Sequence, residues 1–313
     1  MRLSIVIPVY NEAGTLPRVV PAVTAATADI GMDCEILFVD DGSRDDSWNI
    51  ITQLCEQYPM ARGLRLSRNF GKEGAMRAGL EQASGDCVVI MDGDLQFPPD
   101  KLPEMVRLWR EGYQVVECVK SKRQKESLSY GLFAKVFYGL LHRLGGINLR
   151  DATDFRLMDR AVVTAVLAMP ERQLFYRAMS TWVGFSRIQI FIDIADRADG
   201  KSRFSKRALI NLATNAILGY SSLPLQIMTV CGVVFWVFGF VLGVQTLWKY
   251  FFGEAATGFT TVILLILITG SLLMLGLGII GAYLARIYEE VKHRPTHLVS
   301  QIAPKDSADV DAD

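Results

Sequence analysis

The sequence predicts an α/β fold: a doubly wound, mostly parallel sheet in the first part of the chain, followed by a membrane part. Over about the first 120 residues, short aliphatic stretches alternate with longer helix-like ones, the pattern of parallel strands joined by helical crossovers. Acidic clusters directly follow two of the strand candidates, and two long uncharged apolar runs follow residue 220. Together these features indicate a ligand-binding sheet attached to a membrane hairpin.

The elements can be placed in order along the chain. Strand candidates lie near residues 3–8, 35–39, 62–66, 87–91 and 114–119. Helix candidates lie near residues 15–28, 46–57, 72–83 and 99–111. Ser43, three residues before Asp46, is expected to cap the second helix, and Pro98-Pro99 suits the start of the fourth, where a missing N–H costs nothing.

Two apolar runs predict membrane-spanning helices. Ile227–Trp248 and Ala255–Ala285 contain no charged residue, and about 20 apolar residues suffice to cross the hydrocarbon core. A buried hairpin in a soluble core is the alternative, but runs of this length without charge are rare there. The flanking cations are Lys201, Arg203, Lys206 and Arg207 before the first run, and Arg286, Lys292 and Arg294 after the second. By the positive-inside rule, we expect an inner-membrane protein with both termini and the first domain in the cytoplasm.

The chain is expected to divide into three parts. Residues 1–220 form the cytoplasmic domain, residues 221–288 the transmembrane hairpin, and residues 289–313 a cytoplasmic tail, disordered at its end. Two segments of the first part, 128–144 and 203–218, have apolar residues at helical spacing beside cations, which predicts amphipathic helices at the membrane surface or on the sheet.

The composition excludes several classes of function. The 33 basic and 33 acidic residues cancel, so no global field indicates a nucleic-acid partner. Five cysteines without a CxxC pair and three dispersed histidines do not predict a zinc site, and they suit a reducing cytosol.

Carboxylates at two predicted strand ends point to a nucleotide and a metal. Asp40 and Asp41 offer acceptors suited to a nucleobase N–H and a ribose hydroxyl, and Gly42 permits the tight turn. Asp92-Gly93-Asp94 can hold Mg²⁺ or Mn²⁺ with phosphate oxygens and water, although an Asx turn would explain the same triplet. The segment Pro8–Glu12 ends the first strand, either beside the nucleoside or as a purely structural turn.

Six segments together resemble the family 2 glycosyltransferases that load a sugar onto a polyprenyl phosphate, such as bacterial bactoprenol glucosyltransferases and, more distantly, dolichyl-phosphate mannose synthase. They are PVYNE at 8–12, VDDGS at 39–43, RNFGKEGAMRAGL at 68–80, MDGDLQFPP at 91–99, TDFRLMDR at 153–160 and GIIGAYLARIYEEVKHRP at 278–295. The similarity runs from about Leu3 to Pro295, nearly the whole chain. It implies a GT-A (Rossmann-like) fold, inverting transfer from a nucleotide sugar, Mg²⁺ or Mn²⁺, an anchor in the bilayer and a homo-oligomer.

The resemblance also implies roles for individual residues. Contacts to the nucleoside are implied for Pro8, Tyr10, Glu12 and Asp40, and contacts to the metal and diphosphate for Asp92, Asp94 and Gln96. Asp154 would lie at the reaction centre, with structural salt bridging to its neighbour Arg156 as the alternative role. There it would orient the attacking lipid phosphate or stabilise the anomeric carbon, since a phosphate that is already largely dianionic needs no strong base.

The chain departs from the family's pattern in three segments. The acceptor loop, usually with two arginines, has Lys120 and Arg123, and a Gly-x-Ser-Lys-Tyr segment appears with Ser202 and Arg203. These four residues are the expected phosphate contacts, with a solvated basic loop as the alternative interpretation of Lys120–Lys125. The RNFG segment is usually followed by His-Gln, whereas this chain has Lys72-Glu73, which suggests a different choice of donor.

Several alternatives stay open at this stage. UDP-glucose is the leading donor, with UDP-N-acetylhexosamine, GDP-mannose and a UDP-aminoarabinose derivative as alternatives. A processive polysaccharide synthase would need a Gln-x-x-Arg-Trp motif, whereas Arg177 and Trp182 are spaced differently. A catalytically silent membrane adaptor is the non-enzyme alternative.

Overall fold

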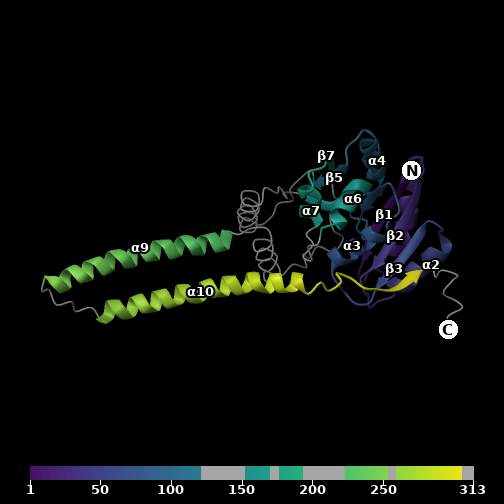
Figure 1. Cartoon of the computed structure of the whole chain (residues 1–313). Coiled ribbons are helices and arrows are strands. Elements are labelled where there is room, and N and C mark those ends of the chain that lie inside the picture. The colour runs from purple at the N-terminus through teal and green to yellow at the C-terminus, as the bar shows by residue number, and fades with distance from the viewer. Residues whose placement is uncertain (121–151, 170–175, 193–222, 253–258, 305–313) are drawn as a thin grey trace. The chain divides into compact units, whose positions relative to one another are not determined.

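The computed structural model describes residues 1–120, 152–169, 176–192, 223–252 and 259–304 (Figure 1). These residues form two compact units, one with all the strands and one with the two long helices. The segments 128–144 and 203–218, predicted to be amphipathic helices, lie outside the described residues, as does the end of the chain.

The first unit is built on one eight-stranded sheet, within the part of the chain that the structure describes. Its strands are β1 (Arg2–Val9), β2 (Asp33–Asp40), β3 (Ala61–Leu66), β4 (Cys87–Ile90), β5 (Val115–Lys120), β6 (Ala152–Asp159), β7 (Arg187–Ile192) and β8 (Val299–Ala303). They lie in the order β7-β5-β6-β4-β1-β2-β3-β8. The five strands predicted from the sequence are confirmed, and β1 to β4 form the expected parallel core.

The sheet is mixed because two strands run against their neighbours. β6 lies between β4 and β5 and is antiparallel to both, and β8 is antiparallel to β3 at the sheet edge. An apolar strand pattern indicates extended structure but carries neither direction nor neighbour, so neither pairing could be predicted. β8 also places residues 299–303 of the expected tail in the first unit.

Helices cover both faces of the sheet. One face carries α1 (Leu16–Thr27), α2 (Ser47–Gln57) and α4 (Leu102–Arg110), which follows the short helix η1 (Pro99–Lys101). The other face carries α3 (Lys72–Gln82), α6 (Arg160–Leu167) and α7 (Tyr176–Trp182). The four helices predicted from the sequence are confirmed, and Pro99 begins η1 as its position suggested.

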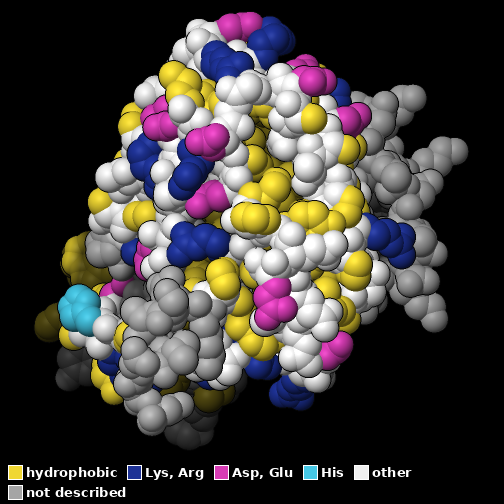
Figure 2. All heavy atoms as spheres, turned by 90° about the vertical axis from the view of Figure 1, so that its right-hand side faces the viewer, with side chains coloured by type: hydrophobic (Ala, Val, Ile, Leu, Met, Phe, Trp, Pro, Cys, Tyr) yellow, Lys and Arg dark blue, Asp and Glu magenta, His cyan; other side chains and the backbone are white. Residues whose placement is uncertain are grey.

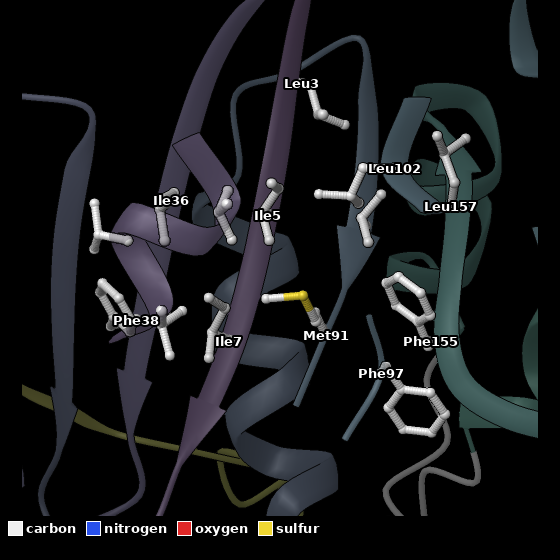
Figure 3. Close-up of a cluster of buried hydrophobic side chains, with 14 of the residues drawn as sticks. Leu3, Ile5, Ile7, Ile36, Phe38, Met91, Phe97, Leu102, Phe155 and Leu157 are labelled. Carbon is white, nitrogen blue, oxygen red and sulfur yellow. The ribbon is translucent and has the colours of Figure 1, made fainter. Parts of the chain in front are cut away.

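Alternation along the strands divides the core into these two layers. Ile5 and Ile7 of β1 point into the cluster of buried side chains that Figure 3 shows, together with Phe38 of β2, whereas Val6 points to the opposite face. In β6, Phe155 belongs to the first layer and packs against Phe97 with ring centroids 5.5 Å apart. Because side chains alternate along a strand, Asp154 and Arg156 lie on the face that α3 and α7 cover.

The expected cap of α2 is wrong. Ser43 does not cap the helix, because its hydroxyl accepts the backbone N–H of Asn11 at 2.9 Å, and the residue at the cap position, Asp46, makes no capping hydrogen bond. Asp45 instead accepts the N–H of Ser47, the first residue of the helix, at 3.1 Å. Ser43 therefore ties the turn after β2 to the turn after β1.

The second unit consists of α9 (Leu223–Phe251) and α10 (Phe259–Val291), which lie side by side (Figure 1). Within them, Pro224–Trp248 and Leu265–Val291 are apolar and long enough to cross a membrane, and no residue of either apolar window is buried. Met228 and Gly276 meet between the helices, where a Cβ on the glycine would lie 2.9 Å from the methionine Cε. Both predicted apolar spans are therefore helical over their described residues.

Candidate active site

The carboxyl ends of β1, β2 and β4 bring the predicted site residues to one edge of the sheet. Val9 pairs with Asp40 across the parallel strands, so the turns that follow these residues begin side by side. On the face in Figure 2, acidic and basic side chains are intermixed.

Asp40 is completely buried and is oriented by its neighbours. Its Oδ1 accepts the backbone N–H of Ser43 at 2.9 Å, and its Oδ2 lies 3.3 Å from Nε of Arg65, close enough for an ion pair although not aligned for a hydrogen bond. Gly42 follows with φ of 68°, and a Cβ there would lie 2.7 Å from the carbonyl carbon of Arg68. Only glycine fits this turn, as the sequence predicted.

Asp41 holds the RNFG segment against the turn after β2. Its two oxygens accept the backbone N–H groups of Phe70 at 2.6 Å and Gly71 at 2.9 Å. Burial raises the pKa of this carboxyl, and the two hydrogen bonds offset only part of the rise. The sequence predicted acceptors at this position but could not show that the chain's own backbone uses them.

The turn after β1 is fastened to the start of α2. Asn11 has φ of 55°, and its side-chain oxygen accepts the N–H of Arg44 at 2.8 Å, while the N–H of Glu12 donates to Ser47 Oγ at 2.9 Å. Pro8 is buried in β1, and Tyr10 is 42% exposed. Of the predicted nucleoside contacts, Tyr10 is thus the one that presents a large surface to solvent.

Glu12 points its carboxylate into the acidic end of β4. Among the described residues, its Oε2 has no hydrogen-bond partner although it is buried, and a Cβ on Gly93 would lie 2.6 Å from it. Burial, followed by the charges of Asp94 and Asp92, raises the pKa of Glu12 to about 7. Either a bound proton or a nearby cation would therefore stabilise the Glu12 side chain in this position.

The loop after β4 combines a turn with exposed carboxylate oxygens. Asp94 Oδ1 accepts the N–H of Gln96 at 3.1 Å, and Leu95 between them has φ of 55°. This is the Asx turn that was the alternative explanation of Asp92-Gly93-Asp94, and it uses only one acceptor site of Asp94. Asp92 and Asp94 are both partly exposed, so ligands can reach them.

Lys72 joins the end of β4 to β6. Its Nζ lies 2.5 Å from Oδ1 of Asp92 and 2.8 Å from Oδ2 of Asp154, and this ammonium thereby bridges the predicted metal site and the predicted reaction centre. Burial lowers the pKa of Lys72, but attraction to both carboxylates outweighs it and raises the pKa above its usual value. The sequence did not place Lys72 in the site; the only signal was its departure from the family's His-Gln pair.

Arg156 is fully buried and has its own partners. It forms an ion pair with Oε1 of Glu117 at 3.5 Å, donates to the carbonyl of Thr153 at 2.8 Å and donates to the hydroxyl of Ser180. Asp154 forms its salt bridge with Lys72. The sequence left a structural salt bridge to Arg156 as the alternative role of Asp154. In the structure, Asp154 pairs with Lys72, which also pairs with Asp92.

The donor atoms in the site fit a hard divalent cation. Among the described residues, no three Asp, Glu, His or Cys side chains form a cluster that holds a metal by itself. Asp92 and Asp94 nevertheless offer the oxygen ligands that Mg²⁺ and Mn²⁺ prefer, beside the unpartnered Oε2 of Glu12, and Mg²⁺ commonly takes one or two carboxylates plus substrate phosphates. The residues therefore suit a metal that arrives with a diphosphate.

The four residues predicted to contact phosphates lie wholly or partly outside the described residues. Lys120 ends β5, but its side chain is outside the described part, and so are Arg123, Ser202 and Arg203 altogether. The structure thus brings together Glu12, Asp92, Asp94 and Asp154, and it leaves the four phosphate contacts as predictions.

Comparisons with known proteins show the family of this chain. The family model described as glycosyl transferase family 2 matches residues 4–167. An uncharacterized glycosyltransferase of Synechocystis is 36% identical over 96% of each chain, and the prophage bactoprenol glucosyl transferase homolog of Escherichia coli K12 is 34% identical over 96% of this chain and 99% of its own. A solved mycobacterial protein of 19% identity shares the fold, with a TM-score of 0.50 over 69% of this chain and 72% of its own. This chain is therefore a glycosyltransferase, with a GT-A fold, and belongs to glycosyl transferase family 2.

Proposed function

We propose that this enzyme transfers a sugar, with inversion, from a nucleotide sugar to a polyprenyl phosphate in the membrane, and that UDP-glucose is the donor. One observation carries the proposal: the carboxylates of Glu12, Asp92, Asp94 and Asp154 meet at one sheet edge in a chain that also has two membrane-length helices. The similarity to a protein named as a bactoprenol glucosyl transferase homolog supports the same acceptor class. The product, a polyprenyl-phosphate sugar, would serve modification of cell-envelope glycans.

The donor nucleotide is proposed to lie over the turns after β1 and β2. Tyr10 offers an exposed aromatic face, and Asp40 and Asp41 are held at the ends of the strands by backbone N–H groups. Each carboxylate oxygen has more than one acceptor site, so both residues retain acceptor capacity, although a nucleoside must open the turn to reach the completely buried Asp40. Pro8 shapes the strand end from which Tyr10 projects.

Asp92 and Asp94 are proposed to hold Mg²⁺ or Mn²⁺, with Gln96 beside the donor diphosphate. When bound, the cation stabilises the negative charge of the departing nucleotide diphosphate. Gly93 lacks a side chain between these carboxylates, and Oε2 of Glu12 takes the space that a Cβ would need. Burial and the charges of both aspartates raise the pKa of Glu12 to about 7, and a bound cation would favour its ionised form.

Asp154 is proposed to act at the anomeric carbon and the attacking phosphate. The nucleophile is an oxygen of the lipid phosphate, which is largely dianionic near neutral pH because its second pKa is about 6. Asp154 therefore orients the nucleophile or stabilises the developing positive charge, and one displacement inverts the anomeric centre. The cations of Lys120, Arg123 and Arg203, with the hydroxyl of Ser202, are proposed to hold the phosphates.

The helical hairpin is proposed to anchor the enzyme in the inner membrane, with both termini and the catalytic unit in the cytoplasm. The cations on either side of the spans favour that orientation. It places the sheet edge on the side where nucleotide sugars are made and where the phosphate of a membrane polyprenol can be reached. A homo-oligomer formed through the spans is part of the same proposal.

The direct test is a donor screen with purified full-length protein and undecaprenyl phosphate in detergent. We expect release of nucleotide and a glycolipid product with UDP-glucose, and loss of both in EDTA. A product only with UDP-N-acetylhexosamine, GDP-mannose or a UDP-aminoarabinose derivative would replace the donor and keep the reaction class. No lipid-linked product with any donor would contradict the proposed function.

A further inference from the structure

The ammonium of Lys72 contacts two carboxylates of the site, and one of them is also proposed to bind a metal. It lies 2.5 Å from Asp92 Oδ1, one of the two proposed metal-binding residues, and 2.8 Å from Asp154 Oδ2. Lys72 is the first residue of α3, and Gly71 before it is held by Asp41. The backbone at Lys72 is thus held in place, and only its flexible four-carbon side chain has to move for the ammonium to change partners.

An internal cation explains how these carboxylates tolerate one another. Burial raises the pKa values of Glu12 and Asp92, and neighbouring carboxylates raise them further: Asp94 and Asp92 act on Glu12, and Asp154 and Asp94 act on Asp92. Lys72 neutralises part of this charge while the site holds no ligand. A divalent cation would relieve the same repulsion, so the two cations compete for the same oxygen atoms.

Lys72 can leave its partners more easily than Arg156, the buried cation nearby. Its side chain is 40% exposed, whereas Arg156 is completely buried beside Glu117. A half-exposed lysine loses little packing when it swings away, and a nearby diphosphate would give the ammonium new acceptors.

We propose that Lys72 competes with the divalent cation for Asp92, so that the metal binds well only together with the nucleotide diphosphate, to which Lys72 then turns. This inference rests on the proposed function, because it takes Asp92 as a metal ligand. Lys72 would thus be a positioning residue that couples the binding of metal and nucleotide. Such coupling keeps the enzyme from holding a metal without its donor.

The test measures Mn²⁺ binding rather than sugar transfer. Full-length protein in detergent is stripped of metal and titrated with Mn²⁺ alone, and the free ion is counted by electron paramagnetic resonance. We expect Lys72→Met to bind Mn²⁺ about tenfold more tightly than the wild type in the absence of nucleotide, within the range of typical coupling. Lys72→Gln serves as a second neutral variant, and Lys72→Arg, which keeps the charge, should bind Mn²⁺ as weakly as the wild type.

Lys101→Met is the matched control. Lys101 also pairs with a carboxylate, Glu104, at 3.1 Å, but it lies in η1 and its partner is not one of the proposed metal ligands. It should leave Mn²⁺ affinity unchanged. Adding UDP, or GDP, should tighten Mn²⁺ binding by the wild type more than by Lys72→Met. If the wild type binds Mn²⁺ with nucleotide but both neutral variants bind Mn²⁺ alone no better than the wild type, the inference is wrong and the proposed function stands. If no protein binds Mn²⁺ with either nucleotide, the proposed metal site is wrong and the inference fails with it.

Discussion

Glu73 accepts the backbone N–H of Tyr176 at 3.1 Å, which joins the first turn of α3 to the first residue of α7. The preceding residue, Lys72, reaches Asp92 and Asp154 from the same turn. The Lys72-Glu73 pair therefore links the site to a helix on the face behind Asp154. Its two side chains point to different partners and can be tested separately.

Glu73→Ala should loosen α7 while leaving the sheet intact. Removal of the acceptor costs about 1–2 kcal/mol locally, because the N–H of the buried Tyr176 loses its charged partner. Hydrogen exchange followed by mass spectrometry should show faster exchange in residues 176–182. Glu73→Gln retains an acceptor oxygen and should keep most of the protection; equal exchange in all three proteins would show that this hydrogen bond does not hold the helix.

Asp94→Asn should reduce sugar transfer on the order of 100-fold, because the proposed cation loses a negatively charged ligand. Asparagine can still accept the N–H of Gln96, so the turn and the thermal stability should be preserved. Rates are compared with Asp100→Asn, an exposed carboxylate in η1 that should have no effect. Near wild-type transfer by Asp94→Asn would remove Asp94 from the metal site.

Gly93→Ala should separate activity from stability. The added methyl group would lie 2.6 Å from Oε2 of Glu12, the far end of a flexible side chain, so Glu12 can move at little structural cost. We expect a melting temperature close to that of the wild type together with a clear loss of kcat/KM. Gly14→Ala is the control, since a Cβ there meets nothing within 4 Å. Unchanged kinetics in Gly93→Ala would mean that the position of Glu12 does not matter for transfer.

Glu12 should make stability fall as pH rises. Its pKa is raised from 4.5 to about 7, so the folded state holds a proton that the unfolded chain releases. The resulting stabilisation is fully present below pH 4.5 and is lost as pH rises to about 7. In EDTA, the melting temperature of the wild type relative to Glu12→Gln should therefore drop between these values and then level off. A constant difference across that range would contradict the raised pKa.

The orientation in the membrane can be read with an impermeant thiol reagent. Gly253, outside the described residues, lies between the two apolar spans, and a cysteine there should react from the outside of intact cells in a cysteine-free variant. Asp100→Cys in the same background should react only after lysis, because η1 belongs to the catalytic unit. Labelling of Gly253→Cys only after lysis would reverse the proposed topology.

The sequence by itself determined the elements of the fold and the chemical character of the site edge. Apolar stretches predicted β1 to β5 and α1 to α4, because buried side chains recur with the period of the strand or helix that carries them. A long uncharged run predicts a membrane span, because charged side chains are costly in the hydrocarbon core. Asp40, Asp92 and Asp94 could be placed at one edge because parallel strands end on the same side.

Only the tertiary structure decided the partners of these elements and side chains. The direction and the neighbours of a strand depend on residues that are far away in the sequence. The local sequence therefore could not predict that β6 and β8 run antiparallel to their neighbours. The bridge from Lys72 to Asp154 joins residues 82 positions apart, and Asp41 reaches Phe70 across 29 positions. Such contacts arise from the packing of α3 onto the sheet, because a side chain's partner is set by the path of the chain through space rather than by its neighbours in sequence.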